Sequence, residues 1–312
     1  MSDLISKINF FSDKATFETI NDSYSGAILK KVKDKDNTYF LKIVKNNTVD
    51  INRIQKIIKI YEKYNINTIK LLEYKDIDDE AYLLYNFING SPLNTVYDKY
   101  SSNDYANMGF NIGSSYRKIN SDYEFDNYFL NDYDLSVLTN QSINSFQKVY
   151  NGKLSYIKSI IDEEKMTKII NRMLELITSF DDEKKVYIHT DVHPKNFMID
   201  DSNILYIVDI ESFSIDYFVM NFRWSIAAAF SNMKNNEFFK GFINGYYNNN
   251  IPIVFNKQLI FVTILNFIEH VIEFSETVNE EYINRYVPRM NHIFNSIDLF
   301  SDDNILENTK LF

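Results

Sequence analysis

The pattern of hydrophobic and polar positions divides the chain into a part with strand periodicity and a longer part with helix periodicity. In the N-terminal part, apolar residues alternate with polar ones or form short apolar runs, which is typical of strands. Strands are expected at 27–32, 38–44, 68–74 and 81–88. Between the second and third of these runs, residues 49–64 have helical spacing, and Asp50 is placed to cap the helix. Together these elements predict a small α+β lobe.

The remainder of the chain is mainly helical. Helices are expected at 103–119, 154–161, 163–180, 220–233, 237–247 and 257–278. The exception is 186–213, where short apolar runs alternate with polar turns. We therefore predict two lobes, a β-rich N-terminal lobe at 1–88 and a larger helical lobe at 89–312.

Composition narrows the class of protein. The chain has 312 residues, 45% of them hydrophobic, no cysteine and a net charge of −10. Disulfides and thiolate metal sites are excluded, and a negative chain is a poor partner for nucleic acid. The acidic balance favours a cationic small molecule or serves solubility alone. No long apolar run or signal sequence is visible, so we expect a cytoplasmic monomer without membrane contact.

One segment carries a constellation of residues suited to phosphoryl transfer. His189 and Asp191 follow an apolar run, Asn196 lies five positions after the aspartate, and Asp209 and Glu211 follow a second apolar run. Phosphoryl transfer needs a positioned hydroxyl and metal ions held by oxygen ligands. On adjacent turns of a strand–loop–strand hairpin, Asp191, Asn196 and Asp209 are expected to converge. The alternative is a polar hairpin with capping Asp and Asn residues.

The segment resembles the catalytic loop of the aminoglycoside phosphotransferase and choline kinase superfamily, His-x-Asp-x-x-x-x-Asn followed by an apolar strand and Asp-x-Asp/Glu. All five named positions match. The resemblance implies a two-lobed, protein-kinase-like α+β fold with ATP or GTP in the cleft between the lobes. It implies Asp191 as catalytic base, His189 as support of the loop, and Asn196 and Asp209 as Mg²⁺ ligands. Glu211 is an additional candidate ligand for metal or substrate.

The N-terminal lobe agrees with this resemblance in outline. Lys42, in the strand 38–44, stands where the family places the lysine that contacts the nucleotide phosphates. Ser25 and Gly26 lie where a phosphate-covering loop belongs. The lysine of the family pairs with a glutamate on the next helix, for which this chain offers Gln55 or Glu62, and the sequence does not decide between them.

Two further segments match the family less closely. The run ending at Asn86 and Ile88 resembles the connection between the lobes, where backbone groups bind the nucleotide base. An ordinary buried strand followed by a turn is the alternative. Asn221 lies in a segment where the family often has an aspartate that ties the catalytic loop to the following helix. We expect an altered structural hydrogen bond there.

The resemblance covers about residues 20–230, and the C-terminal helices are where such enzymes choose their acceptor. Glu269, Glu273 and Glu276 recur at spacings of four and three, which gives one acidic helix face. This face is a candidate cradle for the ammonium groups of a cationic antibiotic such as an aminoglycoside, or a solvated surface. The alternatives are a kinase for a metabolic alcohol such as choline or homoserine, a protein Ser/Thr kinase, and a non-catalytic nucleotide-binding protein.

Overall fold

The structure is a computed structural model that describes residues 10–20, 27–45, 49–152, 158, 161–277, 301–302 and 304–307. The chain forms two compact units. The first unit joins Met1–Thr95 to the distant segment Lys195–Glu211, and the second joins Val96–Pro194 to Ser212–Phe312. The predicted lobe boundary between residues 88 and 89 stays a prediction.

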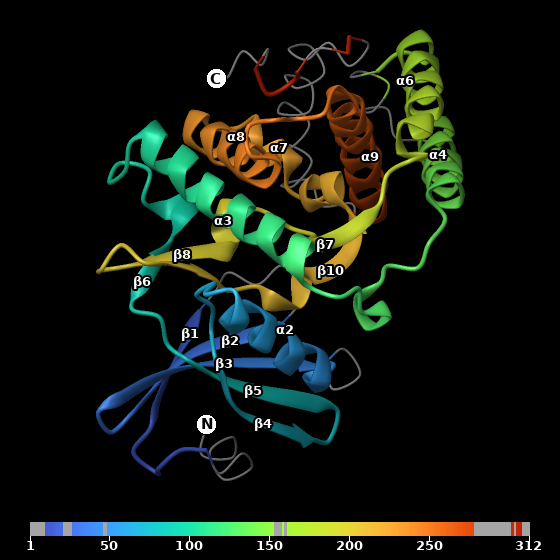
Figure 1. Cartoon of the computed structure of the whole chain (residues 1–312). Helices are drawn as coiled ribbons and strands as arrows, with labels where there is room; N and C mark the ends of the chain where they lie inside the picture. The colour runs from blue at the N-terminus through green and yellow to red at the C-terminus, as the bar shows by residue number, and fades with distance from the viewer. Residues whose placement is uncertain are drawn as a thin grey trace. The chain divides into compact units, whose positions relative to one another are not determined.

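A five-stranded antiparallel sheet forms the main part of the first unit, with the strand order β1-β2-β3-β5-β4 (Figure 1). Its strands are β1 (Thr16–Ile20), β2 (Ile28–Asp34), β3 (Asn37–Lys45), β4 (Leu71–Ile77) and β5 (Glu80–Asn86). The four strands predicted from alternating apolar and polar residues are confirmed as β2 to β5, although their ends are shifted. The strand β1 was not predicted separately.

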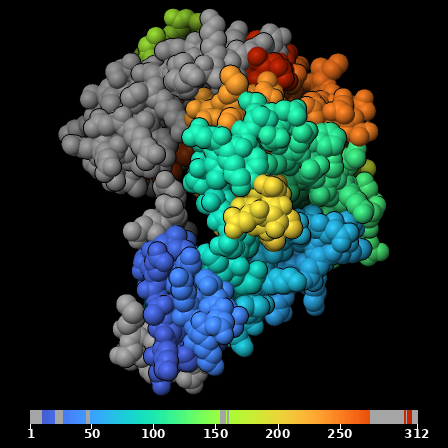
Figure 2. Space-filling view, turned by 90° about the vertical axis from the view of Figure 1, so that its left-hand side faces the viewer, coloured from blue at the N-terminus to red at the C-terminus, as the bar shows by residue number. Residues whose placement is uncertain are grey.

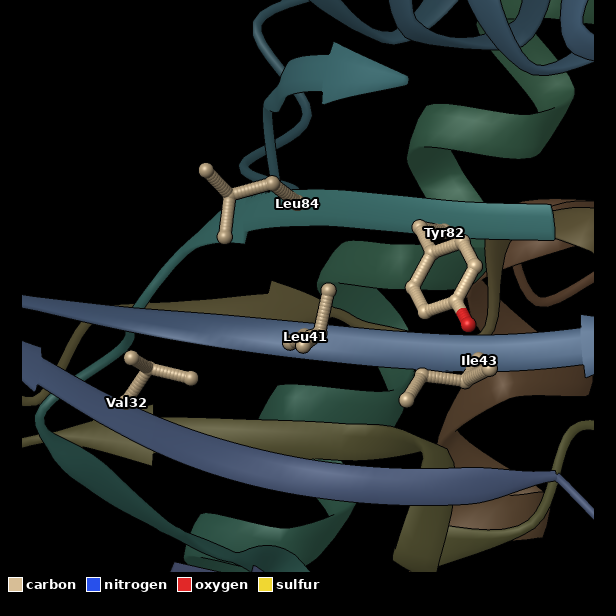
Figure 3. Close-up of a cluster of buried hydrophobic side chains, with 5 residues drawn as sticks. All are labelled: Val32, Leu41, Ile43, Tyr82 and Leu84. Atoms are coloured by element: carbon tan, nitrogen blue, oxygen red, sulfur yellow. The ribbon is translucent and has the colours of Figure 1, made fainter. Parts of the chain in front are cut away.

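A cluster of buried hydrophobic side chains lies on one face of this sheet. The cluster consists of Val32, Leu41, Ile43, Tyr82 and Leu84, from three neighbouring strands (Figure 3). Burying each aliphatic side chain contributes about 1.5–3 kcal/mol. Successive side chains of a strand point to opposite faces, so the residues between these, which include Lys42, face the other way.

Helix α2 (Ile51–Lys63) connects β3 to β4 and lies over one face of the sheet (Figure 1). The Asp50 side chain accepts a hydrogen bond from the Arg53 N–H at 3.1 Å, so the predicted N-cap is confirmed. The helix buries one stripe, formed by Ile54, Ile57, Ile60 and Tyr61. Gln55 and Glu62 lie outside this stripe and are exposed.

A smaller sheet completes the first unit, with the strand order β6-β8-β9. Its strands are β6 (Gly90–Pro92), β8 (Phe197–Asp200) and β9 (Leu205–Ile207). Two hydrogen bonds attach β9 to the chain just before β4: the Thr68 hydroxyl donates to Ile207 O at 2.7 Å, and the Ile207 N–H donates to Asn67 O at 2.9 Å. The turn between β8 and β9, residues 201–204, is exposed to solvent (yellow in Figure 2).

The second unit contains a two-stranded antiparallel ribbon, β7 (Lys185–His189) with β10 (Phe213–Tyr217), and several helices. The longer helices are α3 (Ser102–Asp122), α4 (Leu135–Asn151), α6 (Glu163–Leu176), α8 (Met233–Tyr247) and α9 (Ile253–Thr277). In the part of the chain that the structure describes, none of the helices has the length and apolar character needed to span a membrane.

The predicted helices are largely confirmed, with three differences. Helix α4 was not predicted. The helix expected at 220–233 is wrong, because this stretch consists of a 3-10 helix (Phe218–Phe222), a turn and the short helix α7 (Ile226–Ala229). The helix expected at 154–161 falls mostly outside the described residues. The α+β fold class itself is confirmed.

Helices α3 and α8 lie side by side (Figure 1). Their backbones pack against each other at positions occupied by glycine. A Cβ atom at Gly109 or Gly113 would lie 2.0 Å from a carbonyl oxygen of α8. A Cβ atom at Gly241 or Gly245 would lie 2.0 or 2.1 Å from a carbonyl oxygen of α3. Only glycine allows such an approach, so four of the seven glycines of the chain are required by one contact.

Candidate functional site

In the first unit, the hairpin β8–β9 brings Asn196 and Asp209 to the same end. Its register pairs Phe197 with Ile207, and beyond this pair the Val208 N–H donates to Asn196 O at 3.0 Å. Asn196 is 7% exposed, and Asp209 follows Val208 directly. The hairpin therefore brings Asn196 close to Asp209. The convergence of Asp191 with these two residues stays a prediction, because Asp191 follows β7, which pairs with β10 in the other unit.

Lys42 joins this group by an ion pair. Its Nζ donates to the Glu211 Oε1 at 2.8 Å, and the two side chains are 21% and 33% exposed. Burial acts to lower the pKa of Lys42, but the charge and hydrogen bond of Glu211 and the charge of Asp209 outweigh it, so the pKa is raised. The lysine is therefore held as a cation between the sheet and the segment that follows β9.

This partner differs from the one predicted. The sequence offered Gln55 or Glu62 on the helix after β3, yet both are exposed on α2 while Lys42 is paired with Glu211. Glu211, for its part, was expected to bind metal or substrate. The physical reason is strand alternation, which turns Lys42 to the face opposite the hydrophobic cluster, where the chain after β9 presents a carboxylate.

The sequence interpretation missed Tyr85, which borders the same group. Tyr85 pairs with Phe40 in the β3–β5 ladder, and its side chain is fully buried. Burial, followed by the charges of Glu211 and Asp209, raises the pKa of the phenol well above its ordinary value. A hydrogen bond between the hydroxyl and Glu211 adds to this rise, although the contact does not meet strict hydrogen-bond distance and angle. Only the position of Tyr85 directly before Asn86 hinted at a role.

Removing this hydroxyl should not weaken the fold. The buried Tyr85 hydroxyl carries a desolvation cost and has only a poorly aligned contact with Glu211 to offset it, so we expect Tyr85→Phe to leave the free energy of unfolding unchanged or to raise it by about 1 kcal/mol. Urea denaturation followed by circular dichroism measures the change. Tyr82→Phe is the matched control on the same strand, because the Tyr82 hydroxyl is bonded to Glu80. A clear loss of stability in Tyr85→Phe, equal to that of the control, would contradict the expectation.

The donor set of this group suits a hard cation bound together with phosphates. Among the described residues, no group of three or more His, Cys, Asp or Glu side chains is arranged to hold a metal ion. Mg²⁺ at phosphoryl-transfer sites is bound by one or two protein oxygens and completes its shell with phosphates and water. The amide oxygen of Asn196 and the carboxylate of Asp209 fit that requirement, while Glu211 is committed to Lys42.

The other residues predicted to bind nucleotide are only partly described. Ser25 and Gly26 lie outside the described residues. The Asn86 N–H donates to Lys70 O at 3.1 Å, so this donor is already used within the sheet. The Ile88 carbonyl accepts from the Gly90 N–H at 3.0 Å. Base contacts at the end of β5 therefore stay a prediction, and they would have to use other backbone groups.

In the second unit, the loop that carries Asp191 starts at the end of β7. His189 is fully buried and pairs with Phe213 of β10. Its Nδ1 accepts from the Asp191 N–H at 3.3 Å, and the Thr190 N–H donates to Ser212 O at 2.8 Å. The imidazole and the ribbon thus fix the backbone on the N-terminal side of Asp191, which is the arrangement expected of a structural histidine.

Asn221 holds the loop on both sides of Asp191. Its Oδ1 accepts from the His189 N–H at 2.9 Å, and its backbone carbonyl accepts from the Val192 N–H at 3.1 Å. The Asn221 Nδ2 donates to Phe218 O at 2.6 Å, so both the oxygen and the nitrogen of this buried side-chain amide are hydrogen-bonded. The hydrogen bond expected to be altered is therefore made by an uncharged side chain.

The predicted acidic face on the C-terminal helix does not exist as a unit. Glu269 is 13% exposed and forms a two-pronged ion pair with Arg223, in which the Arg223 Nε donates to the Oε2 at 3.0 Å. Burial raises the pKa of Glu269, and the hydrogen bonds and charge of Arg223 oppose that rise. Glu273 is exposed and lies 3.6 Å from His270. The side chain of Glu276 lies outside the described residues.

The prediction that Glu269 faces an acceptor is thus wrong, because an internal guanidinium already neutralises it. The alternative, a solvated surface, is also wrong for Glu269. Helical spacing places residues on one face but does not reveal a cation from a segment 46 positions earlier. Nothing in the sequence indicated Arg223 as the partner of Glu269, apart from its place two positions after Asn221.

Comparisons with known proteins identify the fold. No protein-family model matches the sequence, and no curated protein is significantly similar to it. A microcompartment-associated aminopropanol kinase matches with a TM-score of 0.68 and 13% identity, over 98% of each chain. A spectinomycin phosphotransferase, solved with ADP and spectinomycin, matches with a TM-score of 0.65 and 14% identity, over 94% of this chain and 91% of that one.

An ethanolamine kinase from Plasmodium vivax is also similar, with a TM-score of 0.61 and 16% identity, over 93% of this chain and 84% of that one. At such identities the likeness concerns the fold. The chain therefore has the protein-kinase-like α+β fold of the aminoglycoside phosphotransferases and the choline and ethanolamine kinases, as the catalytic-loop residues implied.

Proposed function

We propose that this chain transfers the γ-phosphate of ATP or GTP to a hydroxyl group of a small molecule. The observation that carries the proposal is the convergence, in the first unit, of a cation and oxygen ligands from distant segments. Lys42 of β3 lies 2.8 Å from Glu211, and the register of β8–β9 brings Asn196 next to Asp209. A fixed cation beside two hard oxygen donors suits a bound triphosphate.

The proposal assigns roles to residues of each of the two units. Lys42 contacts the phosphates, and Asn196 and Asp209 would hold Mg²⁺, whose charge would offset that of the phosphates. Asp191 orients the acceptor hydroxyl and takes its proton as the oxygen attacks the γ-phosphorus and the bond to the β–γ bridging oxygen breaks. His189 and Asn221 keep the Asp191 backbone in place.

The proposed acceptor is an alcohol that also carries a cationic amine. The similar structures are named for aminopropanol, ethanolamine and spectinomycin, all of which combine hydroxyl and amine groups. The chain has a net charge of −10, which favours the approach of a cation. Within this class an aminoglycoside-type antibiotic is our first candidate. A short amino alcohol is the second, favoured by the 98% mutual coverage with the aminopropanol kinase.

An acceptor screen tests the proposal. The purified chain is incubated with Mg²⁺, γ-labelled ATP or GTP, and three sets of compounds: aminoglycosides, short amino alcohols including choline, and uncharged alcohols. We expect a labelled product from one of the first two sets, and its formation should require Mg²⁺. A product from aminoglycosides alone supports the antibiotic acceptor, whereas a product from amino alcohols alone replaces it with the metabolic one.

Lys42→Met should raise the KM for nucleotide by about tenfold or more, since a charge-assisted hydrogen bond contributes about 1.5–3 kcal/mol. Lys33→Met is the matched control, because Lys33 is an exposed lysine on the neighbouring strand β2.

Absence of product from every acceptor, together with absence of nucleotide binding by calorimetry, would refute the phosphotransferase. Nucleotide binding without product would favour the non-catalytic alternative.

A further inference from the structure

Helix α9 contacts Arg223 at two points. The Glu269 carboxylate forms an ion pair with the Arg223 guanidinium, whose Nε donates to the Oε2 at 3.0 Å. One helical turn earlier, the Asn266 Nδ2 donates to the backbone carbonyl of Arg223 at 2.6 Å. Because the two residues are three positions apart on α9, they face the same side and hold the side chain and the backbone of Arg223 together.

The residue held in this way lies two positions after Asn221. The Arg223 N–H donates to Met220 O at 3.2 Å, so 220–223 form one hydrogen-bonded turn. Asn221 in turn accepts the N–H groups of His189 and Val192, which flank Asp191. An unbroken series of short contacts thus runs from α9 through this turn to the loop, and all of it lies within the second unit.

From this series we infer that Glu269 and Asn266 are positioning residues, which hold Asp191 in its working place through Arg223 and Asn221. The inference rests on the proposed function for the role of Asp191. The contacts that join α9 to the loop through Arg223 and Asn221 do not depend on that function. Neither α9 residue is assigned a contact with a reacting group. They act by fixing the turn whose amide and carbonyl set the backbone of the loop.

The ion pair is suited to this task because it is largely shielded from water. Arg223 is 20% exposed and Glu269 is 13% exposed. Removing one partner of such a pair leaves an uncompensated charge, which pulls the remaining group toward solvent. With Glu269 removed, the Arg223 side chain loses its ion pair. Among the described residues, the turn is then held on α9 by the hydrogen bond from Asn266 and by the packing of Phe222 on Phe255.

Kinetics and hydrogen exchange together test the inference. In Glu269→Ala we expect kcat to fall by about 10- to 100-fold, the range caused by small misplacements of a catalytic group, with the KM for nucleotide unchanged. The amides of His189 and Val192 should exchange faster, because their acceptor Asn221 moves. Asn266→Ala should show the same two effects. Lys257→Ala is the matched control, since it removes a more exposed ion pair of α9, the one with Asp302.

A spectroscopic signal reports on Arg223 without any substrate. Trp224 is the only tryptophan of the chain, and the guanidinium carbon of Arg223 lies 4.7 Å from its ring centroid. We expect the fluorescence of Trp224 to change in Glu269→Ala and to stay as in the unchanged protein in Lys257→Ala. Glu269→Gln, which keeps an acceptor for the guanidinium, should restore part of both kcat and fluorescence.

If Glu269→Ala does not fold, the double variant Arg223→Met with Glu269→Met removes both charges, so no lone charge is left inside, and it should show the same faster exchange. Unchanged exchange at His189 and Val192 in the folded variants would overturn the inference, whatever happens to kcat. A chain that phosphorylates no acceptor would refute the proposed function instead, and the exchange of these two amides would still decide whether α9 positions the loop.

Discussion

Replacing Asp191 with asparagine should lower kcat for phosphotransfer by about 10²-fold or more, which is the scale of general acid–base catalysis. Asparagine has the same shape but cannot accept the proton of an acceptor hydroxyl at neutral pH. The backbone contacts of this position survive the exchange, because the Asp191 N–H donates to His189 and its carbonyl accepts from His193. The affinity for Mg²⁺-nucleotide should therefore stay the same, as calorimetry can measure.

Asp201→Asn is the matched control for this variant. Asp201 is exposed in the turn between β8 and β9 and is bonded to Asn89, so the same chemical change is made outside the proposed site. Its kcat should equal that of the unchanged protein. If Asp191→Asn turned over acceptor at the full rate, the assignment of Asp191 as the base would be wrong, whereas the nucleotide-binding roles in the first unit would be unaffected.

Replacing Gly113 with alanine should destabilise the protein by about 3 kcal/mol or more, because overpacking against a backbone that cannot yield is costly. The added Cβ would lie 2.0 Å from Phe242 O, far inside a normal contact, so α3 and α8 must move apart. In an exposed helix the same exchange would instead gain about 1 kcal/mol. A loss of stability therefore isolates the contact between the two helices.

Urea denaturation of Gly113→Ala and of Gly152→Ala provides the comparison. Gly152 has an extended backbone, and a Cβ there would lie 3.1 Å from Val149 O, which a small shift relieves. We expect Gly152→Ala to stay within about 0.5 kcal/mol of the unchanged protein, as surface substitutions usually do. Equal stability of the two variants would show that α3 and α8 do not approach as closely as described.

The sequence alone determined the features that depend on local patterning. Alternation revealed β2 to β5, helical spacing revealed α2, α3, α6, α8 and α9, and the cap at Asp50 was placed correctly. The proximity of Asn196 to Asp209 could also be predicted, since their spacing follows from two strands joined by a short turn. The pairing of Phe197 with Ile207 brings Asn196 and Asp209 together for that reason. Such features need only neighbours in the chain or in one hairpin.

Only the tertiary structure decided which charges meet. Lys42 pairs with Glu211, 169 positions away, and Glu269 pairs with Arg223, 46 positions away. Periodicity assigns a residue to a face but does not say which distant segment covers that face. The exposed Gln55 and Glu62 were therefore mistaken for partners of Lys42, and Glu269 for a substrate contact. The close contact of α3 with α8 was equally hidden, because a glycine in a helix reveals nothing until the backbone that approaches it is known.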